Sequence, residues 1–445
     1  MALCGLLLGG ATQPGFAGDV ILQLVATPLL VIGGKTALSN SPAGISRREM
    51  LLLGIIVLVP VWQTIPLPPS IWTLLPHADL RMAALQLTGQ PPGWQALSLT
   101  PEASALGALS LLPPIALFLA ARQLDFWQRR MLVLVILAVA AASVFLGMAQ
   151  LAGGPQSGLR FYSNTNALDA VGFFANRNHF AALLYVAILL AAPFALDGGI
   201  GFLEARKGGR GAEASLILFV GGATLMFLVG FAQLMARSRA GTALTIVAAI
   251  CVAWMTMTEP RNRWRRASMA LLGISVITVI LFAAQYGVDR FVERLTFDPQ
   301  NDTRLVIARH TLDAARTFLP FGSGIGSFRD VYTMWETPGD LYPYVYINAA
   351  HDDWLQIALE AGLPGMAAMA LFVVWLLWRG WQVFWHPAAI AQPLDGLLQR
   401  SAWLAIGLLL LHSFADYPLR PSAGMVLLSM CCALICPPLQ LQPKT

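Results

Sequence analysis

Residues 130–152 read RMLVLVILAVAAASVFLGMAQLA and contain Arg130 as their only charged residue. A helix of roughly 20 predominantly apolar residues is long enough to cross the hydrocarbon core of a bilayer. Similar runs recur along the chain, in which 57% of the 445 residues are hydrophobic and only 11% are charged. Because a soluble domain has about 25% charged residues, a cytosolic enzyme, a secreted disulfide scaffold and a disordered protein are excluded. The sequence predicts an all-α polytopic membrane protein.

About twelve segments have the length or composition of membrane helices. They are residues 1–12, 18–34, 49–66, 103–121, 130–152, 174–196, 214–236, 240–257, 268–286, 354–378, 401–415 and 423–438. The first is too short to span a bilayer alone. The five cysteines lie within apolar runs or at the end of one, so they predict neither a disulfide framework nor a metal site.

Basic residues gather in alternate loops between these segments. The clusters are Arg47-Arg48, Arg129-Arg130, Arg206-Lys207 and the stretch RNRWRR at 261–266. Since cytoplasmic loops carry an excess of Lys and Arg, we expect these loops and both termini in the cytoplasm. The net charge of +5 then reflects membrane topology, and no nucleic-acid partner is expected.

The chain divides into four regions. Residues 1–160 hold N-terminal membrane helices, 161–286 central membrane helices, 287–352 a large outer loop and 353–445 C-terminal membrane helices. In the loop, apolar residues at helical spacing predict an amphipathic helix over 303–318, lying along the membrane surface. The stretch PFGSGIGSF at 320–328 predicts a tight turn rather than a dinucleotide loop, because no strand–helix unit surrounds it.

Polar residues at the outer ends of the membrane helices are candidates for function. His351 stands where the large loop re-enters the membrane, and a neutral imidazole there can accept a proton from a hydroxyl. The alternative is a histidine that only caps the next helix. Two further groups are Asn176, Arg177 and Asn178 at the start of one helix, and His412 with Asp416 at the end of another. Helix caps and turn residues are the alternative interpretation of both groups.

Three arginines near the outer face are candidates for binding an anion. Arg237 and Arg239 flank Ser238 at the outer end of the 214–236 segment, and Arg304 begins the predicted loop helix. Arginine can bind phosphate oxygens with two parallel hydrogen bonds. Anchoring to lipid headgroups, or pairing with a neighbouring acid, is the alternative for each.

Taken together, these segments resemble the O-antigen ligase and polymerase superfamily, bacterial inner-membrane proteins that handle polyprenyl-diphosphate-linked glycans. The resemblance covers roughly residues 160–420. It rests on GFFANRNHFA at 172–181, SRAG at 238–241, Arg304, PFGSGIGSF at 320–328, HDDWLQ at 351–356 and HSFADYP at 412–418. The order and spacing of these pieces carry the resemblance, because no single piece is specific.

The resemblance implies a helical membrane glycosyltransferase of the GT-C kind that needs neither a nucleotide sugar nor a metal or other cofactor. It implies that Arg239 and Arg304 bind the lipid diphosphate, with Arg237 and Arg177 as further candidates. It also implies that His351 acts at the acceptor. The family's commoner pattern at this position is His-Asn-x-x-Leu, and here the second residue is Asp352.

Other residues are assigned to the sugar and acceptor cleft. Candidates for acceptor binding or cavity lining are Asn176, Asn178, Asp352, Asp416 and His412. Aromatic rings of the loop are expected to stack on sugar faces. They belong to Trp335, Tyr342, Tyr344 and Tyr346.

The resemblance implies an inverting transferase whose active site faces the periplasm. Its donor would be an undecaprenyl-diphosphate-linked glycan, its acceptor a glycan or lipid, and its surroundings a lipid bilayer. Polysaccharide chain-length or export proteins are further candidate partners. A polymerase building a surface polysaccharide is favoured, and a ligase that transfers glycan to lipid A core or to protein is the alternative. A membrane transporter is a more remote alternative, because no paired half-repeats are visible.

Overall fold

The computed structural model describes residues 1–12, 16–38, 45–76, 78–206, 211–286, 299–338, 347–386 and 392–438. The helices are α1 Ala2–Leu8, α2 Ala17–Leu38, α3 Arg47–Gln63, α4 Pro69–Trp72, α5 Ala78–Thr88, α6 Pro101–Ser110, α7 Leu112–Arg122, α8 Phe126–Ala152, α9 Arg177–Ala205, α10 Ala212–Met235, α11 Arg239–Thr258, α12 Arg265–Tyr286, α14 Pro299–Phe318, α15 Phe328–Tyr332, α16 Asp353–Trp385, α17 Pro393–His412 and α18 Ser422–Leu434. Two short strands, β1 Pro66–Leu67 and β2 Gln95–Ala96, pair antiparallel with Pro66 opposite Ala96.

The predicted all-α polytopic membrane architecture is confirmed. Within the described ranges, eight helical segments are long and apolar enough to cross a membrane. They are Ala17–Lys35, Pro101–Arg122, Phe126–Ala152, Arg177–Ala205, Ala212–Met235, Arg239–Thr258, Asp353–Trp385 and Pro393–His412.

This number is smaller than the twelve segments expected. The helix α1 has seven residues, α3 has 17 and α18 has 13. The α18 helix begins directly after Pro421 and is buried along most of its length, so its apolar composition reflects packing inside the protein. The expected segment 268–286 lies within α12.

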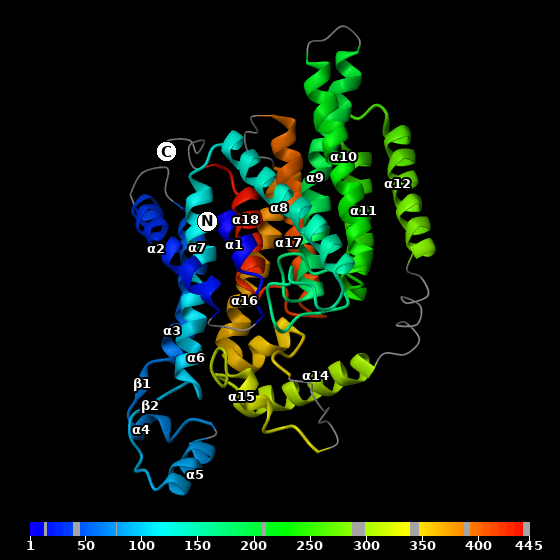
Figure 1. Ribbon diagram of the computed structural model, residues 1–445. Helices are drawn as coiled ribbons and strands as arrows, with labels where there is room; N and C mark the ends of the chain where they lie inside the picture. Colours follow the sequence, from blue (N-terminus) through cyan, green and yellow to red (C-terminus); the bar gives the residue numbers. More distant parts are fainter. Residues whose placement is uncertain are drawn as a thin grey trace.

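The long helices place the connecting segments at two ends of the bundle (Figure 1). One end carries α14 and α15, together with β1, β2, α4 and α5. At the opposite end, ion pairs Arg122–Glu49 and Arg130–Asp395 join α7 to α3 and α8 to α17. The predicted basic loops and the large loop are therefore found at different ends of the molecule.

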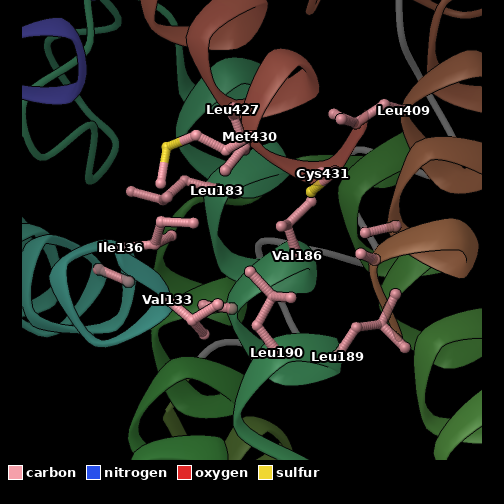
Figure 2. Close-up of a cluster of buried hydrophobic side chains, with 14 of the residues drawn as sticks. Val133, Ile136, Leu183, Val186, Leu189, Leu190, Leu409, Leu427, Met430 and Cys431 are labelled. Atoms are coloured by element: carbon pink, nitrogen blue, oxygen red, sulfur yellow. The ribbon is translucent and has the colours of Figure 1, made fainter. Parts of the chain in front are cut away.

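The helix α9 lies at the centre of the core. It packs against α10, α11 and α17, and its residues from Phe180 to Leu190 are each at most 6% exposed. Figure 2 shows its side chains meeting those of α8, α17 and α18, for example Leu183 with Ile136 and Met430 nearby. A helix that is apolar on every side is stable only when it is surrounded, which explains why α9 is central and why its polar first turn is held in place.

The predicted loop helix and glycine turn are both present. In α14 the protein-facing side consists of Ile307, Thr311, Ala314, Ala315 and Phe318, which are buried. In the turn that follows, Gly322 and Gly324 have φ of 79° and 112°, which glycine adopts readily. A Cβ at Gly322 would lie 2.5 Å from the carbonyl oxygen of Glu360, so the turn packs backbone to backbone on α16.

Three helices begin at the end that carries α14, and each has a polar cap. The side chain of Asn176 accepts a hydrogen bond from Asn178 N (2.8 Å) and begins α9. Ser238 accepts from Gly241 N (3.0 Å) and begins α11. Asp352 accepts from Leu355 N (3.0 Å) and begins α16. Helix N-termini carry partial positive charge, so this end of the bundle is suited to an anion.

Candidate functional site

His351 and Asp416 form a side-chain pair at this end of the bundle. The Nδ1 atom of His351 lies 2.8 Å from Oδ1 of Asp416. His351 directly precedes the cap of α16 and its side chain is 24% exposed, whereas the side chain of Asp416, four residues beyond α17, is fully buried. When Nδ1 donates its proton to the carboxylate, Nε2 carries the lone pair that can accept another.

The carboxylate of Asp416 has partners on both of its oxygens. The side-chain amide of Asn178 donates to Oδ2 of Asp416, and Nη1 of Arg304 donates to the neighbouring carbonyl of Ala415 (2.9 Å). Burial opposes ionisation of this carboxyl, but the hydrogen bond with His351 and the nearby cationic groups, including Arg304, outweigh burial and hold the pKa of Asp416 well below its usual range. Asp416 is therefore an ionised, fixed acceptor for His351.

The Tyr417 ring forms one wall beside the pair. Its centroid lies 5.1 Å from that of His351 and 4.9 Å from that of His179, both in edge-on geometry. Burial, together with the charge of Asp416, raises the pKa of Tyr417 to about 12, so the phenol stays protonated. The amide of Asn348 reaches its hydroxyl at 3.5 Å. These contacts restrict the His351 ring on the side facing the protein.

An ion-pair network ties the segment holding His351 to the segment holding Asp416. Arg420 lies 3.2 Å from Asp353 and 3.2 Å from Glu360, both on α16. Burial would lower the pKa of Arg420, but the two carboxylates outweigh it and raise the pKa. Asp353 and Ser413 also form two hydrogen bonds. The backbone N–H of Asp353 donates to the carbonyl of Ser413 (2.8 Å), and the hydroxyl of Ser413 donates to the Asp353 carboxylate (2.9 Å). The network fixes the distance between the two members of the pair.

A second group, here called the arginine cluster, consists of Arg160, Arg177 and Arg237 around Asp169. Arg177 lies 2.7 Å and Arg237 3.5 Å from the Asp169 carboxylate, which is buried. Arg160 donates to the Asp169 carbonyl at 3.1 Å, and burial lowers its pKa, with the Asp169 charge acting in the opposite direction. Three guanidinium groups thus gather at Asp169, two of them at its carboxylate and one at its backbone carbonyl.

The first turn of α9 joins the arginine cluster to the histidine pair. Arg177 reaches Asp169 in the cluster, and the next residue, Asn178, reaches Asp416 in the pair. Arg239 is the first residue of α11 and is partly buried. It follows Arg237 by two residues, across the Ser238 cap, so it belongs to the same end of the bundle.

Two candidate residues have an unusual backbone conformation. In the part of the chain that the structure describes, the non-glycine residues with positive φ are Arg237 (48°) and His351 (52°). Such conformations are uncommon outside glycine and cost free energy, and they concentrate at functional sites. The surrounding contacts hold both residues in place despite this cost.

The structure brings some of the predicted residues together and separates others. His351 and Asn178 meet at the Asp416 carboxylate, and Arg304 lies beside it at the carbonyl of Ala415. Arg177 meets Arg237 at Asp169. Asp352 instead caps α16, and the backbone hydrogen bonds of that cap only partly offset burial, which raises its pKa. Three predicted residues, Tyr342, Tyr344 and Tyr346, lie outside the described residues.

Two other predicted side chains, those of His412 and Trp335, make contacts inside the protein. His412 is buried and its Nδ1 lies 3.2 Å from the hydroxyl of Tyr185 on α9. The Trp335 ring packs edge-on against Phe318 of α14 at 5.9 Å. Asn176 serves as the α9 cap described above.

Sequence reasoning missed Asp169, Arg160 and the role of Tyr417. A signal for Asp169 was present, because it is the sole acid in the 153–173 segment and Arg160 lies in the same segment. Tyr417 directly follows Asp416, and its partner His179 was visible in the motif at 172–181. What the sequence lacks is the contact between these distant segments.

Residues 224–370 match the family model described as O-antigen ligase. The matched range contains Arg237, Arg239, Arg304 and His351, and it ends before Asp416. No curated protein matches the chain.

Proposed function

We propose that this membrane protein is an enzyme that transfers or polymerises an undecaprenyl-diphosphate-linked oligosaccharide. The match of residues 224–370 to the family model described as O-antigen ligase supports this proposal. The acceptor is the growing glycan of a surface polysaccharide. The observation that carries the proposal is the pairing of a partly exposed His351 with a buried, ionised Asp416, next to a group of arginines.

His351 acts as the general base in this mechanism. Its Nδ1–H bond to Asp416 fixes the ring and the tautomer, as the acid does in a hydrolase triad, and Nε2 receives the proton of the acceptor hydroxyl. The hydroxyl oxygen then bonds to the anomeric carbon while the bond from that carbon to the diphosphate oxygen breaks. Attack opposite the leaving group inverts the anomeric centre.

The arginines stabilise the departing diphosphate. Arg239 and Arg304 are the principal ligands, and Arg237 and Arg177 assist them. Guanidinium groups and helix N-termini supply positive charge where the leaving group becomes more negative. Arg304 is held 2.9 Å from the carbonyl next to Asp416, which supports a diphosphate position close to the proton acceptor. Positive charge from arginine makes a metal ion unnecessary in this proposal.

The site faces the periplasm of the bacterial inner membrane in this account. The basic clusters support this orientation. They lie at the end of the bundle away from α14, and loops rich in Lys and Arg stay in the cytoplasm. In intact spheroplasts, an impermeant maleimide should label Arg316→Cys on α14 and leave Arg263→Cys, at the other end, unlabelled. The reverse pattern would place the site in the cytoplasm and exclude a periplasmic donor.

Polymerisation and ligation use the same donor and differ in the acceptor. We favour polymerisation of lipid-linked repeat units. Transfer of the glycan to lipid A core is the second candidate, and the family description, O-antigen ligase, supports ligation. The purified protein in nanodiscs should convert undecaprenyl-diphosphate-linked repeat units alone into a ladder of longer lipid-linked chains. A product that forms only after lipid A core is added would replace the polymerase by the ligase, and no product with either acceptor would contradict both.

A further inference from the structure

Three buried arginines converge at the end of the bundle opposite the candidate site. Arg122 of α7, Arg129 of α8 and Arg379 of α16 are 1%, 3% and 7% exposed. They donate hydrogen bonds to the carbonyls of Pro437, Cys436 and Ile435 respectively, just beyond α18. Basic groups commonly bind the last carbonyls of a helix. This explains Arg129, whose guanidinium also donates to the carbonyls of Leu124 and Arg122.

Hydrogen bonds to these carbonyls do not neutralise the positive charge of the three arginines. In the described part of the chain, the carboxylate paired with these arginines is Glu49, which lies 3.4 Å from Arg122. The same carboxylate accepts from Ser46 N and Cys436 Sγ, each at 3.2 Å. Carbonyl oxygens carry no net charge, so three buried guanidinium groups face one paired carboxylate, and the charge of Asp125 acts in addition on Arg129. Burying uncompensated charge is costly, and an additional anion would remove that cost.

A cavity of about 240 Å³ opens beside two of the arginines. Its lining includes Ser46, Arg122, Arg379, Gln382 and Gln399. The Nε atoms of Arg122 and Arg379 are buried and have no hydrogen-bond partner among the described residues. A water molecule occupies about 30 Å³ in the liquid, so the cavity has room for a phosphate group with its first solvent molecules.

We propose that this cavity binds the phosphate group of an anionic membrane lipid. Arg122 and Arg379 supply the donors, and the polar lining also includes Gln382, Gln399, Glu49 and His386. Trp378 also lines the cavity, with the guanidinium groups of Arg48 and Arg379 at 5.2 and 5.6 Å from its ring. Tryptophan and arginine mark the headgroup level of a bilayer, and basic pockets between membrane helices bind anionic headgroups. The site lies away from His351 and is independent of the proposed transferase reaction.

The decisive variant is Gln382→Glu. Gln382 accepts a hydrogen bond from Nη1 of Arg379, and a carboxylate of the same shape keeps that bond while placing a negative charge where the lipid phosphate would sit. Gln128→Glu is the matched control, since it makes the same change at the same end on an exposed capping residue.

The test is thermal unfolding of the delipidated full-length protein in detergent, with added phosphatidylglycerol, phosphatidylcholine or inorganic phosphate. Phosphatidylglycerol should raise the Tm of wild type and of Gln128→Glu, and phosphatidylcholine should not. For Gln382→Glu we expect that shift to disappear and the lipid-free Tm to exceed that of wild type. A shift equalled by inorganic phosphate identifies free phosphate as the source, and one given by the lipid alone identifies the headgroup. Absence of any shift with phosphatidylglycerol, or an undiminished shift in Gln382→Glu, would overturn the proposal.

Discussion

The Nδ1 atom of His351 lies 2.8 Å from a carboxylate oxygen of Asp416, although the two residues are 65 positions apart. His351 lies just before the start of α16, and Asp416 lies four residues after the end of α17. The pair therefore exists only when these two helices pack together. Arg420 and its two carboxylates on α16 hold the docking in place. The proposed base therefore has its carboxylate partner only in the docked arrangement of these helices.

Replacing Asp416 by Asn should lower turnover by about 10²- to 10⁴-fold, because the imidazole loses the ionised partner that fixes its tautomer. Binding of the lipid-linked donor should change little, since the arginines remain. Turnover and donor affinity of the purified variant, measured separately, check this. A large loss of affinity with unchanged turnover would show that Asp416 serves the donor and not His351.

The same substitution should have a pH-dependent effect on stability. The native pKa of Asp416 lies below that of an unfolded Asp, about 3.9, so its ionised form stabilises the fold above that value. The stabilisation is lost as the pH falls through the native pKa. The Tm difference between wild type and Asp416→Asn should therefore be largest at about pH 5 to 7 and should shrink toward about pH 3. A difference that grows on acidification would contradict an ionised Asp416.

Arg304→Lys should reduce turnover by at least about tenfold, because lysine keeps the charge and loses the planar two-pronged donor. Arg316→Lys is the control on the same helix, where the arginine pairs with Asp313 and is 67% exposed. We expect the control to retain wild-type turnover. Equal activity of the two variants would remove Arg304 from the diphosphate site, and Arg239→Lys would then be the next variant to compare.

Asp169→Asn should destabilise the protein more than Asp313→Asn does, although both break an Arg–Asp pair. The Asp169 carboxylate is buried and bonded to two arginines that are themselves partly exposed, so we expect a loss of about 1–3 kcal/mol when their donors lose this acceptor. The Asp313–Arg316 pair is exposed, and such pairs are worth about 0.2–1 kcal/mol. Unfolding of both variants in the same detergent decides this, and equal losses would mean that Asp169 does not organise the arginine cluster.

Chelation of divalent ions should leave turnover unchanged, because arginines supply the positive charge at the leaving group in this mechanism. The purified enzyme is treated with EDTA and assayed with the lipid-linked donor. Loss of activity that one divalent ion restores would replace the arginine mechanism by a metal-assisted one.

The fold class was predictable because membrane helices are recognised from composition alone. The number of spanning helices was not, since an apolar segment such as residues 423–438 is equally compatible with a short helix buried inside the protein. In α14, the sequence pattern of Leu305, Ala308, Leu312 and Ala315 predicted the helix correctly. Leu305 and Leu312 of this pattern are 65% and 40% exposed, whereas Ala315 is buried against the protein.

The candidate site was predictable residue by residue but not as an arrangement. His351, Arg304 and Asp416 were all visible as polar residues at helix ends. Only the packing of α14, α16 and α17 shows that His351 pairs with the Asp416 carboxylate and that Arg304 bonds to the carbonyl next to it. Asp169 was missed because its signal in the sequence, a single acid in the same segment as Arg160, does not show which other residues it contacts. Its importance comes from two arginines that reach it from the ends of other helices.

The most direct test of the proposed base is turnover per folded protein for His351→Gln with the undecaprenyl-diphosphate-linked donor. Glutamine keeps a hydrogen-bonding group and cannot take up the acceptor proton, so turnover should fall by about 10²- to 10⁴-fold while donor binding and Tm stay close to wild type. His310→Gln on α14 is the control and should remain active. A fully active His351→Gln enzyme would contradict the account and leave His351 as a structural residue at the start of α16.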